Sequence, residues 1–339
     1  MNPATLLSRR FRFDQIPNLS GKPEEGVVGR VALVTGGSAG IGFYDALALA
    51  RAGATVIIVS ANEEKGKQAE AEVNKQLREV TSYGSVTWYG LDLGNLKEVD
   101  AFAKRLSGEL ERLDILIANA GIGQAPFGLT GDGIERHFAV NNLSHHILIL
   151  SLLPLMKKTA QTAPPTTVRI VMQSSEMHRV APGDVKFASK EEINREDYDG
   201  ARLYGRTKLG NILFARELVK RKLADTDNHV LIMSVHPGTV ATEVQGAWTE
   251  SYGAFGKLLE MGSNLFGKSA AEGAEASLWA ATCTDIFEGN WKDFQGNYYS
   301  EPYGKPHTES KQAQDPELAD AYWNLSTKLI KEITGEDLS

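Results

Sequence analysis

The chain alternates short apolar runs, rich in β-branched side chains, with segments long enough for a helix. The runs lie at residues 31–35, 54–60, 85–91, 115–118, 167–172, 229–235 and 296–300. Short runs of this kind between turn residues are typical of buried strands. Parallel neighbours need a crossover connection, which a helix supplies. The order therefore predicts an α/β fold, a doubly wound parallel sheet with helices on both faces.

The length of 339 residues allows two domains at roughly 150 residues each, although one α/β domain can run to about 250. Because the strand-like runs extend through residues 29–300, we expect a single domain there. Residues 1–28 read as an irregular N-terminal extension, and residues 301–339 as a tail with a closing helix. The sequence Asp315-Pro316-Glu317 predicts the start of that helix, since it supplies an N-cap, a helical proline and a first-turn acid.

Charge and cysteine content exclude several classes of protein. The chain has 36 basic and 43 acidic side chains and a formal net charge of −7, whereas a general nucleic-acid binder needs a basic face. Its single cysteine, Cys283, rules out an internal disulfide. The seven histidines are scattered, and the adjacent His145 and His146 would face different directions on a helix. We therefore expect no metal site.

No apolar run approaches the roughly 20 residues that cross a bilayer. The most apolar one, Ile147–Met156, is interrupted by a serine and a proline. We therefore expect no membrane span and a cytoplasmic location. The alternative is a transit peptide, because Arg9, Arg10 and Arg12 precede the first acidic residue of the chain.

The segment TGGSAGIG follows the first strand and opens a helix. Its glycines Gly36, Gly40 and Gly42 would let the backbone approach a pyrophosphate, which the free N–H groups of a helix N-terminus bind. The same letters contain G-x-S-x-G, which would make Ser38 a hydrolase nucleophile. Only irregular sequence precedes the segment, which argues against the strand and loop that an oxyanion hole needs. A glycine turn without a ligand is the third interpretation.

A second group of residues points to proton transfer. Tyr204 and Lys208 are spaced i, i+4 on a predicted helix and so share one face. An ammonium beside a phenol favours the phenolate, which makes Tyr204 a candidate general acid or base. Ser174-Ser175, Asn119-Ala120-Gly121 and Pro237-Gly238 fall at the ends of three other strands. Ligands of parallel sheets bind at these ends, so the groups would meet at one site.

Together these segments resemble the short-chain dehydrogenase/reductase superfamily over about residues 29–300, and most of all its retinol-dehydrogenase-like and fungal oxidoreductase branch. The segments that carry the resemblance are TGGSAGIG (35–42), LDLG (91–94), ANAG (118–121), FAVNNLSHH (138–146), RIVMQSSEMH (169–178), YGRTK (204–208) and HPGTVATE (236–243). The resemblance implies a single Rossmann-fold domain and a nicotinamide cofactor that exchanges hydride.

The resemblance also implies a role for each matching residue. Asn141 would keep the active-site helix open and hold a water, and Ser175 would polarise the substrate oxygen. Tyr204 would exchange the proton, while Lys208 would bind ribose hydroxyls and lower the pKa of Tyr204. The expected cofactor contacts are Gly36, Ser38, Gly40, Ile41, Gly42, Ser60, Asn62, Asp92, Leu93, Asn119, Ala120, Gly121, Tyr204, Lys208, Pro237, Gly238, Val240 and Thr242.

The sequence departs from the common family pattern in two places. Tyr204 lies 29 residues after Ser175, which implies an insertion over about residues 179–195 at the substrate mouth. After the second strand stand Ser60, Ala61 and Asn62, where an acid would select NAD and an arginine NADP. No acid there repels a 2′-phosphate, so we favour NADP(H) without excluding NAD(H).

We therefore expect an NAD(P)-dependent oxidoreductase that interconverts an alcohol and a ketone or aldehyde. The apolar stretch within residues 239–268 would be a substrate lid, which favours an apolar, medium-sized substrate. The alternatives are a cofactor-binding sensor or scaffold without turnover, and a double-bond reduction or cyclisation on the same fold. A homodimer or homotetramer would form through the helices at residues 94–111 and 201–223.

Overall fold

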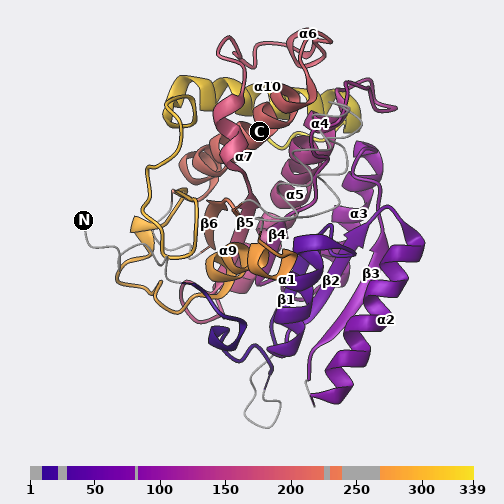
Figure 1. Cartoon of the computed structure of the whole chain (residues 1–339), viewed down its shortest axis with the longest axis vertical. Helices are drawn as coiled ribbons and strands as arrows, with labels where there is room; N and C mark the ends of the chain where they lie inside the picture. Colours follow the sequence, from indigo (N-terminus) through magenta and orange to yellow (C-terminus); the bar gives the residue numbers. More distant parts are fainter. Residues whose placement is uncertain (1–9, 22–28, 81–82, 225–229, 239–267) are drawn as a thin grey trace.

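The computed structural model describes residues 10–21, 29–80, 83–224, 230–238 and 268–339. A seven-stranded sheet lies at its centre, with strand order β3-β2-β1-β4-β5-β6-β7 (Figure 1). Every neighbouring pair is parallel. The strands are β1 (Val31–Thr35), β2 (Thr55–Ser60), β3 (Ser85–Gly90), β4 (Ile115–Ala118), β5 (Val168–Gln173), β6 (Val230–Val235) and β7 (Tyr298–Tyr299). The predicted fold class is confirmed.

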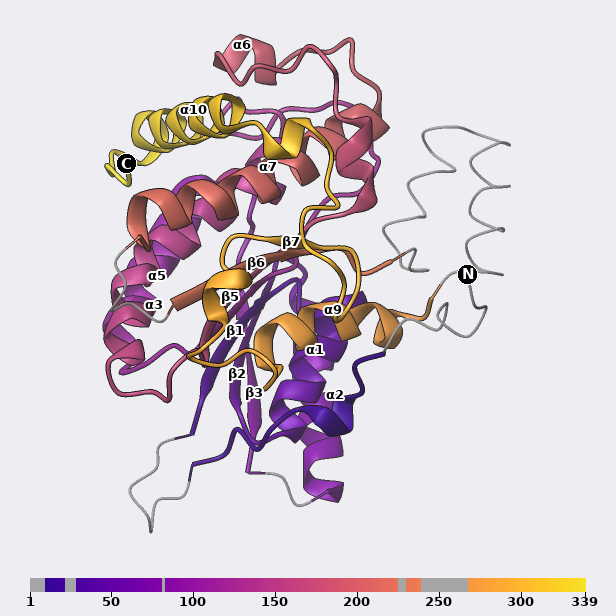
Figure 2. The same ribbon diagram turned by 90° about the vertical axis from the view of Figure 1, so that its left-hand side faces the viewer.

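Helices cover both faces of this sheet (Figure 2). One face carries α1 (Gly40–Arg51), α2 (Glu63–Glu79) and α9 (Ala270–Thr282). The other carries α3 (Leu96–Glu109), α5 (Ser144–Ala160), α7 (Gly200–Lys222) and α10 (Pro316–Thr334). The chain order reverses between β1 and β4, where the next strand is added on the opposite side of β1. A crevice for a ligand opens at such a reversal, at the carboxyl ends of the strands.

Short polar caps start the helices at the positions that the sequence indicates. Asn95 accepts a hydrogen bond from the Glu98 N–H at the start of α3. Ser269 and Glu272 form a reciprocal capping box at the start of α9. At α10, the side chain of Asp315 accepts from two backbone N–H groups, and Pro316 is the first helical residue.

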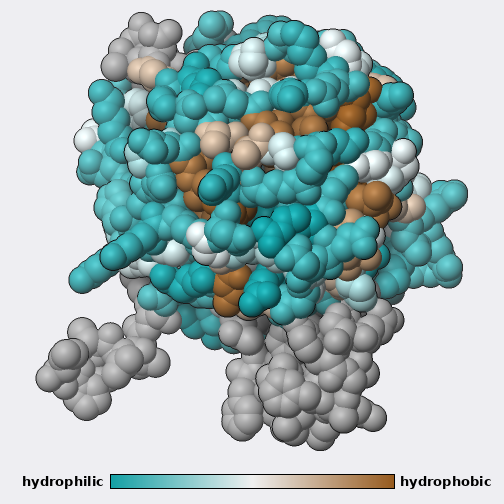
Figure 3. Space-filling model, turned by 90° about the horizontal axis from the view of Figure 1, so that it is seen from above, coloured by the Kyte–Doolittle hydropathy of each residue, from teal (hydrophilic) through white to brown (hydrophobic). Residues whose placement is uncertain are grey.

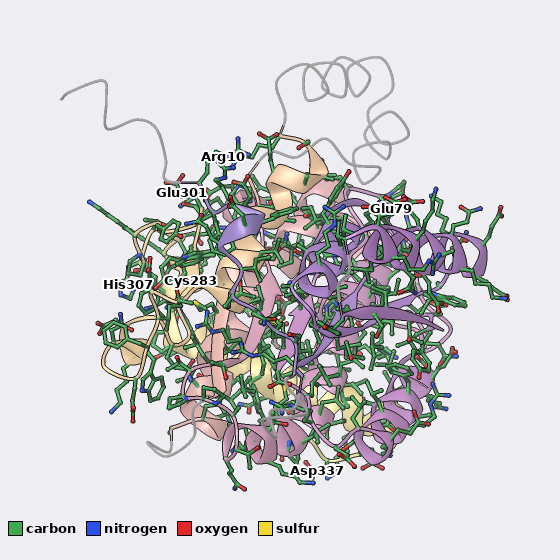
Figure 4. The ribbon with its side chains drawn as sticks, turned by 90° about the horizontal axis from the view of Figure 1, so that it is seen from below. Arg10, Glu79, Cys283, Glu301, His307 and Asp337 are labelled. Atoms are coloured by element: carbon green, nitrogen blue, oxygen red, sulfur yellow. The ribbon has the colours of Figure 1, made fainter. Side chains whose placement is uncertain are left out.

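Each face of the sheet has its own apolar core, and the chain ends contribute to both. Phe11 and Leu19 from the N-terminal segment are buried in the core that contains α1 and α9. Tyr322 and Trp323 of α10 are buried in the core that contains α5 and α7. In Figure 4, Arg10 lies on the outer surface near α9, where its guanidinium pairs with Glu275.

Two predicted boundaries differ from the structure. The helix expected from Gly133 to about Leu153 begins at Arg136 and runs to Ala160. It has a short α-helical start, α4 (Arg136–Phe138), and then a π-helical turn, η4 (Ala139–Leu143). Pro154 lies inside α5 and does not end it. The last strand is also shorter than residues 296–300.

The helix over Arg136–Ala160 is long and apolar enough to cross a membrane, whereas the sequence led us to expect no membrane span. It is the one such helix among the described residues, and 83% of its most apolar window is buried inside the protein. A core helix of a water-facing protein passes the same test, so its length is weak evidence for a span. Seen from above, the described surface is mostly hydrophilic with limited apolar areas (Figure 3).

The C-terminal helix α10 packs on α7 and α3. These are the two helices at which we expected copies of the chain to associate. The expected homodimer or homotetramer stays a prediction. Because α10 packs on α7, a partner that approaches α7 would also meet α10.

Candidate active site at the carboxyl edge of the sheet

The turn between β1 and α1 is shaped to receive an anion. Gly36 and Gly40 have φ of +69° and +57°, a backbone region that favours glycine. A Cβ atom on Gly42 would lie 2.5 Å from the Gly36 carbonyl oxygen, so the turn closes only around a bare backbone. No side chain caps the start of α1 at Ala39. The first N–H groups of α1 are therefore available to a phosphate.

The hydrolase interpretation of this turn gains no support. A serine nucleophile needs a base within hydrogen-bond reach. Among the hydrogen bonds of the described residues, none joins Ser38 to a histidine. At the end of β1 it is Thr35 that contacts a histidine, with its Oγ1 2.9 Å from His145 Nε2.

Thr35 ties β1 to β4 through a single hydroxyl group. Its Oγ1 accepts from the N–H groups of Asn119 and Ala120 at 3.0 and 2.9 Å. Burial lowers the pKa of His145 to about 4, so the ring is neutral. Its Nδ1 donates to the Asn141 carbonyl at 3.1 Å, which leaves Nε2 to accept from Thr35. This chain of bonds connects the glycine turn with the π-helical turn.

Asn141 lies in that π-helical turn and holds the loop after β4. Its Oδ1 accepts from the Ile122 N–H at 2.7 Å, and its Nδ2 donates to the Ile122 carbonyl and to Thr207 Oγ1, both at 3.0 Å. A Cβ on Gly121 would come within 3.1 Å of Asn141 Oδ1. The side chain thus joins the loop that follows Asn119-Ala120-Gly121 to α7, the helix of Tyr204 and Lys208.

Ser174 and Ser175 have different surroundings at the end of β5. Ser174 is buried, and its hydroxyl donates to the Lys208 carbonyl at 2.8 Å. Ser175 begins the 3-10 helix η5 (Glu176–Val180), and its Oγ accepts from the Met177 N–H at 3.1 Å. The Ser175 hydroxyl also acts on Tyr204, because it lowers the pKa of the phenol. Of the two serines, Ser175 is therefore the one beside the phenol.

The pKa of Tyr204 moves in the direction opposite to the one that the resemblance implied. Burial raises the pKa of Tyr204 to about 12, and the hydrogen bond with Ser175 lowers it only in part. The Lys208 ammonium donates to the Gln173 carbonyl at 2.8 Å and lies 5.3 Å from the centre of the Tyr204 ring. Burial also lowers the pKa of Lys208 to about 8. The Lys208 ammonium therefore contacts the backbone and faces the ring of Tyr204. Burial is the largest cause of the raised pKa of the phenol.

The residues expected at the adenosine end lie at the ends of β2 and β3. Ser60 Oγ accepts from Trp88 Nε1 at 3.0 Å. Asn62 caps α2 by accepting from the Lys65 N–H. Asp92 is exposed and accepts from the Gly94 N–H at 2.8 Å, while Leu93 is buried. These contacts fix the turns and leave the Asp92 and Ser60 side chains at the sheet edge.

The nicotinamide end falls partly outside the described residues. Pro237 and Gly238 follow β6, and Gly238 has a φ of +87°. A Cβ on Gly238 would meet the side chain of Lys268 at 3.0 Å. Val240, Thr242 and residues 239–267 of the expected lid lie outside the described residues. In the described parts of the chain, no group of three or more His, Cys, Asp or Glu side chains could hold a metal ion.

The sequence analysis missed a buried group of charged and polar side chains, one of which lies on α7, the helix of Tyr204 and Lys208. Glu135, His137 and Arg206 are fully buried. The Glu135 carboxylate lies 2.6 Å from His137 Nδ1 and 3.2 Å from Arg206, and His137 Nε2 lies 2.8 Å from the Gly123 carbonyl. Arg206 also donates to the Ile193 carbonyl at the end of α6 (Lys190–Ile193). The place of Arg206 inside the YGRTK segment was the one signal of this group in the sequence.

The arrangement of the glycine turn, Asn141, Ser175, Tyr204 and Lys208 on one parallel sheet defines a class of dehydrogenase. A family model described as short chain dehydrogenase matches residues 30–177. The chain is 36% identical to retinol dehydrogenase 12 of Mus musculus, over 90% of this chain and 87% of that protein. The chain belongs to the short-chain dehydrogenase/reductase family and is an oxidoreductase.

Two further relatives and two solved structures agree with this family. The chain is 32% identical to retinol dehydrogenase 14 of Homo sapiens, over 96% of this chain and 94% of that protein. It is 35% identical to oxidoreductase bli-4, mitochondrial, of Neurospora crassa, over 96% and 75%. An uncharacterized protein of Mycobacterium paratuberculosis has a TM-score of 0.67 and 28% identity, covering 95% of this chain and 98% of that one. The Pseudomonas aeruginosa RhlG/NADP active-site complex has a TM-score of 0.58 and 25% identity, covering 80% and 93%.

Proposed function

We propose that the protein is an NAD(P)-dependent oxidoreductase that interconverts an alcohol and a ketone or aldehyde. The observation that carries this proposal is that Lys208 joins Tyr204 to the end of β5, at the same sheet edge as the uncapped glycine turn. Its ammonium lies 5.3 Å from the centre of the Tyr204 ring and donates to the carbonyl of Gln173, two residues before Ser175. A sensor or scaffold has no need for a phenol, a lysine and a serine hydroxyl at one strand end. The family relationship supports a nicotinamide cofactor in this place.

The residues around the glycine turn suit a dinucleotide. Gly36, Gly40 and Gly42 would hold its pyrophosphate, and Lys208 its ribose hydroxyls. When bound, the cofactor supplies or accepts the hydride. We favour NADP(H), because Ser60 and Asn62 at the end of β2 bring no negative charge against a 2′-phosphate. The similar Pseudomonas aeruginosa RhlG/NADP active-site complex supports this choice.

In the proposed mechanism Ser175 Oγ binds the substrate oxygen and Tyr204 moves the proton. Because burial raises the pKa of Tyr204 to about 12, the phenol holds its proton at neutral pH. A protonated phenol suits donation to the oxygen of a carbonyl as it becomes an alcohol. The apolar, medium-sized substrate stays a prediction from the lid sequence.

Cofactor titrations with a Tyr204→Phe variant test the proposal. NADPH and NADH are titrated into the wild-type protein, which is then assayed against a panel of aldehydes, steroid ketones and polycyclic ketones. We expect Tyr204→Phe to lower kcat by about 100-fold or more, since it removes the general acid, while the Kd for NADPH stays within about threefold. Tyr83→Phe is the matched control, because Tyr83 is 88% exposed.

Two outcomes would contradict this proposal. If neither dinucleotide binds the wild-type protein, the cofactor assignment is wrong. If a dinucleotide binds but no carbonyl of the panel turns over, the sensor interpretation replaces it.

The cytoplasmic location also stays a proposal. Of the arginine-rich N-terminal residues, Arg10 pairs with Glu275, and Phe11 beside it is buried against α9. Residues from Arg10 onwards therefore belong to the folded domain, which disfavours a cleaved leader that extends past them. Imaging of a C-terminal fluorescent fusion checks this: we expect diffuse cytoplasmic signal, and a mitochondrial pattern would overturn it.

A further inference from the structure

His178 connects Ser175 with a segment that lies more than a hundred residues away in the chain. Its Nδ1 lies 2.6 Å from the Ser175 carbonyl oxygen, and its Nε2 accepts from the Ser310 N–H at 3.0 Å. The His178 N–H also donates to the Ser175 carbonyl, at 3.0 Å. The ring is fully buried. Its position is therefore fixed from both sides.

These bonds determine which nitrogen of His178 carries the proton. A carbonyl oxygen can only accept, so Nδ1 must donate to Ser175. A backbone N–H can only donate, so Nε2 must be the acceptor toward Ser310. Burial lowers the pKa of His178, while the charges of Glu176 and Glu309 oppose this and that of Arg179 reinforces it. The ring is thus a neutral donor and acceptor.

The segment around β7 and Ser310 makes three more contacts with the turn that holds Ser175. The Tyr298 hydroxyl donates to Glu176 Oε1 at 2.9 Å, and the Tyr298 ring packs edge-on against His178 with centroids 5.1 Å apart. Arg179 donates to the Thr308 carbonyl. On the far side, Glu309 pairs with Arg216 of α7. The segment is therefore anchored both to η5 and to the helix that carries Tyr204.

We propose that His178 is a positioning residue that sets the place of Ser175 relative to Tyr204, with the segment 298–310 as its support. This rests on the proposed function, in which Ser175 and Tyr204 act on the same substrate oxygen. The Ser175 carbonyl and Oγ are held by consecutive parts of one turn, so a shift of the carbonyl moves the hydroxyl as well. Small displacements of such groups reduce turnover more than they reduce binding.

Replacement of His178 by two amides of different length tests the proposal. His178→Asn places its NH₂ group where Nδ1 stands and keeps the donor to Ser175, whereas His178→Gln places it where Nε2 stands. We expect His178→Asn to keep kcat within about threefold and His178→Gln to lower it about tenfold, as a misplaced reacting group does. The Kd for NADPH should stay unchanged in both. Alcohol oxidation by His178→Gln should need a higher pH, because Ser175 in its wild-type place lowers the pKa of Tyr204.

Lys186→Gln is the control, since Lys186 is exposed in the loop that follows η5 and is not one of the contacts that hold segment 298–310; we expect wild-type kcat. Equal kcat and equal pH profiles for the Asn and Gln variants would overturn the positioning role and leave His178 as packing alone. Failure of the proposed function looks different, because the wild-type protein would then bind no dinucleotide or would turn over no carbonyl of the panel. If either amide variant fails to fold, Tyr298→Phe tests the support instead, with the same pH shift expected and an unchanged profile overturning the proposal.

Discussion

The side chain of Asp45 is a carboxyl group buried where α1 meets α9. Its Oδ1 lies 2.6 Å from the Ser277 hydroxyl, which also lies 3.0 Å from the Ala274 carbonyl. A hydroxyl carries one proton and cannot donate to both acceptors. Both bonds form if Asp45 is protonated and donates to Ser277, which then donates to Ala274. Burial raises the pKa of Asp45 to about 8, in agreement with this geometry.

We predict that Asp45 makes stability depend on pH. From about pH 4 to pH 8 the folded state holds one proton more than the unfolded state, so the free energy of unfolding falls as pH rises, by up to about 1.4 kcal/mol per unit. Asp45→Asn removes this titration. Urea unfolding at pH 5, 6, 7 and 8 should show the wild-type protein losing about 3 kcal/mol relative to Asp45→Asn. A difference that stays constant over this range would show that Asp45 is ionised when folded.

At the scale of elements, two glycines in helices have opposite reasons to be there. Gly42 lies in the first turn of α1, where a Cβ would collide with the Gly36 carbonyl at 2.5 Å and with Asn119 at 2.6 Å. Gly108 is exposed in α3, and nothing lies within 4 Å of the position of its Cβ. One glycine is required by a close approach, while the other only lowers the stability of its helix.

We predict opposite effects for alanine at these positions. Gly42→Ala should reduce NADPH affinity at least about tenfold, because the pyrophosphate turn must open, and should destabilise the fold. Gly108→Ala should stabilise the protein by about 0.5–1 kcal/mol without changing the Kd for NADPH. Thermal unfolding and fluorescence titration measure both. Unchanged NADPH binding by Gly42→Ala would show that the turn is not the cofactor site.

The elements and strand-end groups could be predicted because they depend on local patterns. Apolar runs, N-caps and glycine turns are read from a few neighbouring residues, and Ser175, Tyr204 and Lys208 follow from their order along the sheet. Local patterns do not predict the π-helical turn at Asn141, since it depends on Ile122 and Thr207 from other elements, and only the family resemblance implied an opened helix there. The role of Ser310 at His178 depends equally on contacts between distant parts of the chain.

At the scale of the whole molecule, α10 completes one of the two cores. The Trp323 ring stacks on Phe214 of α7 with centroids 5.6 Å apart and planes at 10°. The Tyr322 hydroxyl lies 2.9 Å from His146 Nε2, and the guanidinium of Arg221 lies 5.4 Å from the centre of the Trp323 ring. A Cβ on Gly210 would meet the Tyr322 ring at 2.6 Å. The tail expected from the sequence is thus a packed part of the domain.

We predict that Trp323→Ala lowers the free energy of unfolding by about 3–5 kcal/mol, as large cavities in cores do. Its distance from the sheet edge should leave the Kd for NADPH unchanged at temperatures where the variant is folded. Lys328→Ala is the control, because Lys328 is an exposed residue of the same helix and such changes stay within about 0.5 kcal/mol. A loss below about 1 kcal/mol for Trp323→Ala would mean that α10 docks weakly.

The place of α10 after the sheet and α7 in chain order has a consequence for biosynthesis. A ribosome delivers the sheet and α7 first, so the surface that Tyr322 and Trp323 later cover is exposed to the cell while α10 is still in the exit tunnel. This core therefore closes later than the sheet that it covers. Nascent chains stalled before residue 316 therefore present an apolar groove of the kind that chaperones bind.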